Sequence, residues 1–329
     1  MTTKPKQIAE PIKVRSTAPA LFPECAEYRL ALSDQVEIAF LDNHRASPHP
    51  PLVLLHGIFD NKATWTRLAA QLTGYRLIAP DLVGHGFSSK PTFGAQPVDQ
   101  RYAPDMQVEF LDAFIAALEL DEMILVGNSL GGGLALRLYL RFPELAKKVR
   151  GLVLLAAAGY PQKLPGHLRE FGGWPGRLLT LAPVRALAHG SGLLRLAARH
   201  TFRRCFHDRK KIPPALIDTT LAVLQTPNIL YVYHYSARNI APPVSKRGAS
   251  HSAAAPRAEF HQRFAEITCP TLVIWGQQDR ILHPHSAQRF AADIPNAQLH
   301  LLEDCGHAPH LEYPDVVAQH ITHWLGDHP

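Results

Sequence analysis

Short, largely apolar runs alternate with segments of helical periodicity along most of this chain. The runs lie at 51–55, 76–79, 123–126, 152–156, 271–275 and 297–302. They are too short for helices and are typical of strands buried on both faces. Apolar residues recur at spacings of three and four across 103–118, 130–141, 286–292 and 314–325, which predicts helices there. The alternation predicts a mostly parallel sheet that helices cover on both faces.

Composition excludes several other classes of protein. Apolar residues make up 46% of the 329 positions and charged residues 19%, so the chain can bury a large core and is neither disordered nor a membrane bundle. No run approaches the roughly 18 apolar residues of a membrane span, and the first 20 residues lack the apolar run of a secretory signal, so we expect a cytoplasmic protein. The four cysteines lie far apart without a C-x-x-C pair, which predicts neither a metal site nor a disulfide framework.

Positive charge is concentrated in one segment. Between 160 and 250 there are 14 Lys and Arg against 3 Asp and Glu, whereas the remainder has 20 against 25. This segment also lacks the strand patterns found on either side of it. We therefore expect residues 160–259 to form a separate, basic and mainly helical unit, and residues 1–159 and 260–329 to form the core. No recognised nucleic-acid motif accompanies the charge, so we expect no nucleic-acid partner.

Chemically versatile residues follow four of the predicted strands. Parallel sheets of this kind gather ligands at the carboxyl ends of their strands, so these positions should lie together. The segments are His56-Gly57-Ile58-Phe59, Gly127-Asn128-Ser129-Leu130-Gly131, Gly276-Gln277-Gln278-Asp279 and Asp304-Cys305-Gly306-His307. A serine, an acid and a histidine thus occur in that order.

Ser129 is the candidate nucleophile. The segment 127–131 matches G-x-S-x-G, and it follows an apolar run and opens a predicted helix. A serine on such a sharp turn has a strained backbone and needs small neighbours. The alternative is a glycine-rich helix start at which Ser129 merely caps the helix.

A serine hydroxyl needs a base within hydrogen-bond reach and a third group that orients the base. We predict His307 as the base, because it follows Gly306 in a loop just after a strand, and His310 is the alternative. We predict Asp279 as the orienting acid, and its alternative role is a helix N-cap. Asp304 and Asp293 are further candidates for the acid.

Acyl transfer also needs main-chain N–H donors for the negative charge that develops on the carbonyl oxygen. One donor should be the N–H of Leu130. The other should come from the loop after His56-Gly57, either from Ile58 or, as the alternative, from Phe59. We expect His56 itself to be structural.

Taken together, these motifs resemble the α/β-hydrolase family. The resemblance rests on His56-Gly57, the D-x-x-G-x-G-x-S pattern at 81–88, the elbow at Ser129, Asp279 and Gly306-His307. It implies an eight-stranded, mostly parallel sheet, a Ser-Asp-His triad and a lid at 160–259 inserted after the sixth strand. Serine at the elbow disfavours haloalkane dehalogenases and epoxide hydrolases, which carry aspartate there.

Within the family, the segments 56–65 and 127–132 are similar to those of bacterial lipases and monoacylglycerol-lipase-type esterases. The resemblance therefore implies a serine hydrolase that cleaves a small-molecule acyl ester through an acyl-enzyme, without a cofactor. Two alternatives stay open. One is a carbon–carbon bond hydrolase of meta-cleavage-product type, although that group usually has a G-x-G-P-G run after its H-G motif, which is missing here. The other is a non-catalytic ligand-binding homologue.

Leucine and alanine alternate with arginine in the predicted lid from Arg177 to Arg204. This composition suits an amphipathic helix, which either packs on the core as a cover or contacts an anionic lipid surface. The sequence also places three tyrosines in this unit, Tyr231, Tyr233 and Tyr235, which either line the acyl pocket or pack within the lid.

Overall fold

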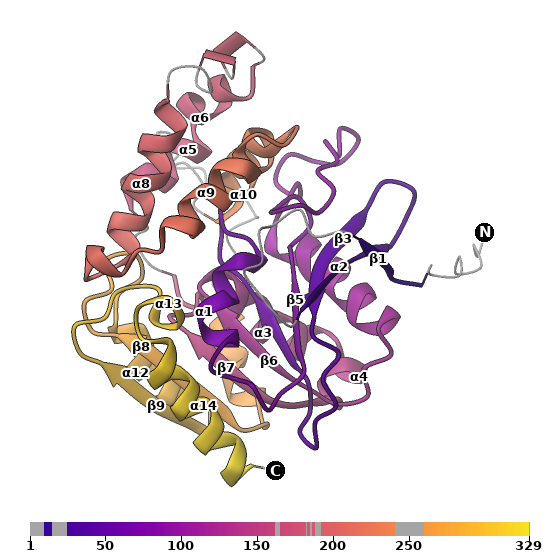
Figure 1. Ribbon diagram of the computed structural model, residues 1–329, viewed down its shortest axis with the longest axis vertical. Coiled ribbons are helices and arrows are strands. Elements are labelled where there is room, and N and C mark those ends of the chain that lie inside the picture. The colour runs from indigo at the N-terminus through magenta and orange to yellow at the C-terminus, as the bar shows by residue number, and fades with distance from the viewer. Residues whose placement is uncertain are drawn as a thin grey trace.

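A twisted, mostly parallel sheet runs through the centre of the molecule in this computed structural model (Figure 1). The structure describes residues 10–14, 25–161, 165–181, 183–184, 186–187, 192–240 and 260–328. Within these ranges the sheet has nine strands in the order β1-β2-β3-β5-β4-β6-β7-β8-β9. The strands are β1 (Ile12–Val14), β2 (Ala26–Ala31), β3 (Glu37–Asp42), β4 (Leu52–Leu55), β5 (Leu77–Pro80), β6 (Met123–Asn128), β7 (Val149–Leu155), β8 (Thr271–Gly276) and β9 (Ala297–Leu302).

Strands β4 to β9 are mutually parallel, whereas β1, β2 and β3 pair antiparallel with their neighbours. The sheet has one strand more than the eight that the family resemblance implies. The additional strand is β1, three residues long, which pairs with β2 at the sheet edge and leaves Ile12 exposed. Its shortness and exposure leave no apolar run in the sequence by which it could be recognised.

Helices cover both faces of the sheet, and successive strand residues pack on opposite faces. In β4, Val53 and Leu55 join the core beneath one helical layer, whereas Leu52 and Leu54 join the core on the other face. This period of two is what a sheet buried on both sides requires. The first layer comprises α2 (Pro104–Ala117), α3 (Leu130–Arg141) and α12 (His285–Asp293). The second comprises α1 (Thr66–Ala69) and α14 (Pro314–Asp327).

Shorter elements complete the core: 3-10 helix η1 (Lys62–Trp65), α4 (Pro143–Ala146), 3-10 helix η3 (Phe260–Glu266) and α13 (Pro309–Glu312). The strands and helices predicted from 51 onward in these flanks are all present, with ends shifted by a few residues. The predicted α/β fold with a mostly parallel sheet is therefore confirmed.

A group of helices is inserted between β7 and β8, where the sequence predicts the separate basic unit. Its elements are α5 (Gly166–Gly172), α6 (Trp174–Leu179), α8 (Leu193–Cys205), 3-10 helix η2 (Arg209–Lys211), α9 (Pro214–Leu224) and α10 (Ile229–Ile240). These helices lie together at one end of the molecule (Figure 1). Residues 162–164 and 241–259 of the predicted unit, including its end at 259, lie outside the described residues.

Candidate active site

Ser129 lies in the tight turn between β6 and α3, with φ 54° and ψ −117°. Three main-chain hydrogen bonds hold it there. Its N–H donates to the Leu155 carbonyl (3.0 Å), and its own carbonyl accepts from Gly133 (3.2 Å) and Ala158 (2.8 Å). Positive φ at a residue with a side chain is costly, so the surrounding structure must impose it.

The two glycines of the G-x-S-x-G motif occupy positions that have no space for a Cβ atom. A Cβ atom at position 127 would stand 2.4 Å from the main-chain carbon of Gly131. One at position 131 would stand 1.9 Å from the Leu55 carbonyl oxygen in the neighbouring strand. Both distances are far below van der Waals contact, so the turn can approach the sheet this closely only with glycine at both positions.

Asp279 and His307 are hydrogen-bonded to each other, Oδ2 to Nδ1, at 2.7 Å. The other carboxylate oxygen of Asp279 accepts the N–H groups of Ile281 (2.7 Å) and Leu282 (3.0 Å). Asp279 therefore acts as a turn cap and as the partner of the imidazole at the same time, although the sequence offers these roles as alternatives. Because Nδ1 faces a carboxylate, the ring is held with its Nε2 free for other contacts.

The loop that carries His307 is anchored to the elbow and to the inserted helices. The side-chain amide of Asn128, the residue before Ser129, donates to the His307 carbonyl at 3.2 Å. The N–H of His307 donates to the carbonyl of Cys205, at the end of α8, at 2.6 Å. The candidate base thus lies against the elbow and rests on the insertion.

Glu312 is the second anchor of this loop, and the sequence analysis missed it. Its side chain is buried, and its carboxylate accepts the N–H groups of Gly306 (2.7 Å), His207 (3.0 Å) and Asp208 (3.1 Å). These donors belong to the histidine loop and to the insertion. The only sequence signal was a glutamate five residues after the candidate histidine, next to a Tyr-Pro pair that precedes a helix.

The H-G loop passes directly beside the elbow. A Cβ atom on Gly57 would stand 3.4 Å from the Cβ of Ser129, so Ile58 and Phe59 follow immediately next to the serine. Among the described residues, the main-chain N–H groups of Ile58, Phe59 and Leu130 have no hydrogen-bond acceptor. His56 is fully buried and bonds only to main chain here, to Leu82 and Gly57, and burial lowers the pKa of its imidazole.

A buried ion pair holds this loop in place. Lys62, on η1, is 1% exposed; its Nζ lies 2.7 Å from Asp81 Oδ2 and 3.3 Å from Glu27 Oε1. The Lys62 N–H also donates to Asp81 at 2.6 Å. Burial alone would raise the pKa of Asp81, but the Lys62 ammonium, the charge of His56 and the hydrogen bonds from Lys62 and Phe87 together keep it below its usual value. The pair joins the loop after β4 to the loop after β5.

Asp60, also in the H-G loop, is a charged group that the sequence analysis did not single out. Burial raises the pKa of its carboxyl to about 7, against hydrogen bonds from Asn61 and Thr64 that lower it. The charge of His307 lowers the pKa of Asp60 and Asp60 raises that of the Tyr233 phenol, so all three side chains share one region. His310 lies on the far side of Thr64, whose hydroxyl is 2.9 Å from His310 Nε2.

His310 is fully buried beside Trp65, and burial, with His307 nearby, lowers the pKa of its imidazole to about 3. Its imidazole is therefore neutral and bonds to Thr64, and no hydrogen bond joins it to Asp279 in the described structure. The other candidate acids lie elsewhere: Asp293 accepts from the Tyr160 hydroxyl (2.9 Å), and Asp304 is exposed beside His207.

The three tyrosines of α10 divide between two environments. Tyr233 is buried against Phe59, with ring centroids 4.6 Å apart, and its hydroxyl donates to the Phe59 carbonyl at 3.2 Å. Tyr231 and Tyr235 pack against each other with tilted rings, 4.6 Å between the centroids, and both contact Arg101. Residues two apart on a helix point to nearly opposite sides, so only Tyr233 reaches the H-G loop.

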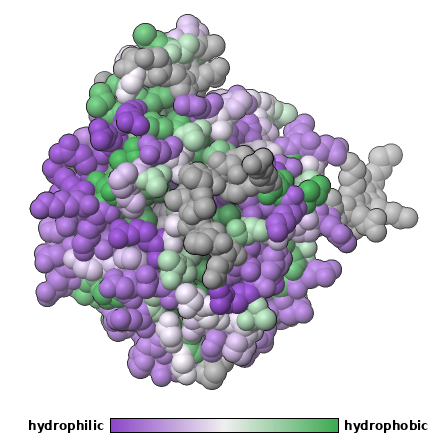
Figure 2. All heavy atoms as spheres, in the orientation of Figure 1, coloured by the Kyte–Doolittle hydropathy of each residue, from purple (hydrophilic) through white to green (hydrophobic). Residues whose placement is uncertain are grey.

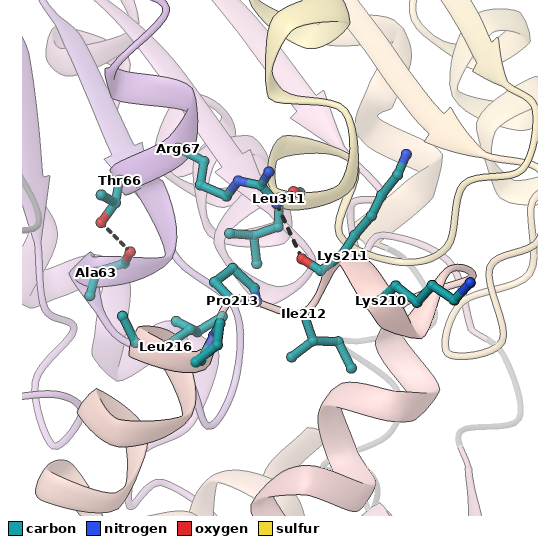
Figure 3. A pocket seen from close by; sticks show the side chains of 11 residues that line it. Ala63, Thr66, Arg67, Lys210, Lys211, Ile212, Pro213, Leu216 and Leu311 are labelled. Carbon is teal, nitrogen blue, oxygen red and sulfur yellow. Dashed lines mark hydrogen bonds between the residues drawn. The ribbon is translucent and has the colours of Figure 1, made fainter.

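A cavity of about 530 Å³ separates η1 and α1 from η2 and α9. Arg67 bridges one side of it, since its guanidinium donates to the carbonyls of Lys211 (3.2 Å) and Leu311 (2.7 Å), as Figure 3 shows for Lys211. The arginine thereby ties the core to both the insertion and α13.

The described side chains include no cluster of three or more histidine, cysteine, aspartate or glutamate residues arranged to hold a metal ion. No described helix has the length and apolarity to cross a bilayer.

Known proteins similar to this chain include both lipases and meta-cleavage product hydrolases. Lipase 1 of Psychrobacter immobilis is 28% identical over 88% of this chain and 80% of that protein. A 2-hydroxymuconate semialdehyde hydrolase of Pseudomonas putida is 30% identical over 92% of both chains. The structure of a 2-hydroxy-6-oxo-6-phenylhexa-2,4-dienoate hydrolase from Rhodococcus superimposes with a TM-score of 0.70 at 20% identity, over 92% of this chain and 99% of that one. The family of the alpha/beta hydrolase fold matches residues 50–314. The chain therefore belongs to the α/β-hydrolase fold family.

Proposed function

We propose that this protein is a serine hydrolase of carboxylic esters. The observation that carries the proposal is the 2.7 Å hydrogen bond between Asp279 and His307, on a loop that Asn128 holds against the strained turn of Ser129. A buried carboxylate on Nδ1 orients the imidazole and stabilises its protonated form, which is what a serine nucleophile needs from its base.

In the proposed reaction, Ser129 Oγ attacks the ester carbonyl while His307 Nε2 accepts the hydroxyl proton. The oxyanion receives hydrogen bonds from the N–H groups of Leu130 and Ile58, with Phe59 as the alternative to Ile58. The C–O bond then breaks, and His307 gives its proton to the departing alcohol. Water, activated by His307, attacks the acyl-enzyme and releases the acid.

The inserted helices at 160–259 serve as the lid in this proposal. Phe171 on α5 contacts Phe59 with ring centroids 5.5 Å apart, and Tyr233 on α10 contacts the same ring. These aromatic side chains offer an apolar wall for the acyl chain of a small ester, such as a monoacylglycerol.

Asp60 favours a neutral ester over the substrate of a carbon–carbon bond hydrolase. With a pKa of about 7, its carboxyl is partly ionised at neutral pH, and it lies in the same region as His307. The similar Rhodococcus enzyme acts, by its name, on a dienoate, which carries a carboxylate. A second negative charge in a partly dehydrated site costs free energy, so Asp60 weighs against such an anion.

A series of p-nitrophenyl esters from acetate to palmitate, assayed with wild type, Ser129→Ala and Asp279→Asn, tests the proposal. We expect hydrolysis by the wild type, loss in Ser129→Ala, and a fall in kcat of about 10⁴-fold in Asp279→Asn because the imidazole loses its orienting charge. Activity on a ring-fission dienoate with none on esters would establish the carbon–carbon hydrolase instead. Failure of a fluorophosphonate probe to label Ser129 would indicate a binding protein without catalysis.

A further inference from the structure

The outer end of the insertion exposes an unusual number of large apolar side chains. Of the eight that the described residues expose, six lie between 174 and 196. They are Trp174 (73% exposed), Leu178, Leu181, Leu187 (72%), Leu193 and Leu196 (64%). We call this group the cap tip. In Figure 2, green apolar and purple polar spheres lie side by side over this upper part of the molecule. A group of exposed large apolar side chains of this kind marks a contact with another phase or molecule.

The same surface is basic. Arg177, Arg195, Arg199 and Arg203 are exposed in α6 and α8, and the sequence has no aspartate or glutamate from Trp174 to Arg204. Within the described structure, one ion pair touches this set, between Arg195 and Asp218 at 3.3 Å. Arg204 differs from the others, since it is half-buried at the end of α8.

We propose that the cap tip docks on an anionic lipid surface. Apolar side chains enter the interfacial region of a bilayer, and each arginine beside them gains from the negative surface potential. Tryptophan favours this region because its ring is apolar and its N–H polar. A second copy of the chain would fit this surface poorly, because a two-fold contact would bring the same arginines together without acidic partners.

The docking surface is directly connected to the candidate site. Trp174 opens α6, three residues after Phe171, whose ring contacts Phe59 in the H-G loop. The hairpin of α5 and α6 therefore presents one side to the lipid and the other to the region beside Ser129. If the proposed ester hydrolysis holds, acyl esters in the membrane would enter at this end. Docking itself does not depend on that reaction.

The tryptophans provide a direct readout. The chain has four, and Trp65, Trp275 and Trp324 are at most 1% exposed, so a change of emission on lipid binding reports on Trp174. Ser129→Ala protein would be titrated with vesicles of phosphatidylcholine alone or mixed with phosphatidylglycerol. We expect a shift of emission to shorter wavelength and co-sedimentation with the mixed vesicles, both weakened by salt. The serine variant separates docking from turnover.

Two sets of variants complete the experiment. Joint replacement of Arg177, Arg195 and Arg199 by Gln should weaken binding to the mixed vesicles by about a hundredfold, at roughly fivefold per charge. Leu178→Ser with Leu196→Ser should also weaken it. Ile12→Ser and Arg150→Gln, exposed positions on β1 and β7, are the matched controls and should bind as the parent does.

Three results would overturn the docking proposal. The first is the absence of an emission shift with either vesicle, and the second is binding that the control substitutions weaken as much as the cap-tip substitutions do. The third is a dimer in sedimentation velocity that Leu196→Ser dissociates, which would assign the surface to self-association. Absence of p-nitrophenyl ester hydrolysis by the wild type would contradict the proposed function and leave the docking result unaffected.

Discussion

The side chain of Asn128 donates to the main-chain carbonyl of His307 at 3.2 Å, and to the Leu155 carbonyl at 3.0 Å. The residue that precedes the elbow serine thus connects β6, β7 and the loop of the candidate base. One amide group therefore joins the elbow to the histidine loop, although 179 residues separate Asn128 from His307 in sequence.

We expect Asn128→Ala to lower kcat for p-nitrophenyl esters by about 10- to 100-fold while KM changes little, because a histidine displaced by a fraction of an ångström accepts the serine proton less readily. Asn296→Ala removes another side-chain amide bonded to a carbonyl, that of Thr268, far from the site, and should leave kcat unchanged. Equal losses in both variants would contradict a positioning role.

Glu312→Gln should lower the free energy of unfolding by about 2 kcal/mol, since an ionised acceptor of three main-chain N–H groups is replaced by a neutral one. Urea unfolding followed by circular dichroism measures this change. Glu303→Gln, on an exposed side chain of the preceding turn, is the control and should have almost no effect. An unchanged midpoint for Glu312→Gln would show that the carboxylate does not stabilise the junction.

Lys62→Met should cost about 3–5 kcal/mol, because it leaves the buried carboxylate of Asp81 without its cation. The same substitution at Lys147, whose ion pair with Glu144 is exposed, should cost less than about 0.5 kcal/mol. Chemical denaturation of both variants at neutral pH provides the comparison. A similar, small effect at the two sites would mean that the Asp81 charge is not buried in solution.

Asp60 should make stability depend on pH. Its pKa of about 7 in the folded chain exceeds the value of about 4 for an exposed aspartate, so the folded state holds more protons between these values. The contribution of Asp60 to the free energy of unfolding is fully present below about pH 4 and is lost as the pH rises through about 7. The urea midpoint of the wild type should therefore fall relative to that of Asp60→Asn as the pH rises from about 5 to about 8.

Asp121→Asn, at a highly exposed carboxylate, is the control for this measurement. Its midpoint should run parallel to that of the wild type over the same range, because the Asp121 side chain is 94% exposed and folding changes its surroundings little. If the urea midpoint of Asp60→Asn also stays parallel to that of the wild type, the Asp60 carboxyl ionises as an exposed group does.

Most of the sheet could be predicted from the sequence because its parallel strands are buried on both faces and therefore appear as unbroken apolar runs, as at 123–126 and 271–275. The sequence analysis missed β2 and β3, although five of the six residues of β3 are buried and 38–41 form an apolar run. In β2, apolar and polar residues alternate from Ala26 to Leu30, which is also a pattern typical of a strand.

Some residues of the candidate site could likewise be predicted from the sequence, and others could not. Ser129, Asp279 and His307 follow apolar strands, so the topology alone brings them to one edge, and their catalytic roles stay predictions. Glu312 and Asn128 act through main-chain carbonyls and N–H groups, which leave no trace in residue types. The buried charge of Lys62 was equally hidden, because its partners Asp81 and Glu27 lie far away in sequence.

The end of α8 limits how far the two parts of this molecule can be treated as interchangeable modules. Cys205 accepts the N–H of His307, and the next turn offers the N–H groups of His207 and Asp208 to Glu312. Replacing the whole insertion with that of another hydrolase would remove these hydrogen bonds to the histidine loop and to Glu312, even if the new helices covered the site well. Exchange of the inserted helices should therefore stop before residue 205, and diversification by recombination should be easiest in the segment from α5 to the middle of α8.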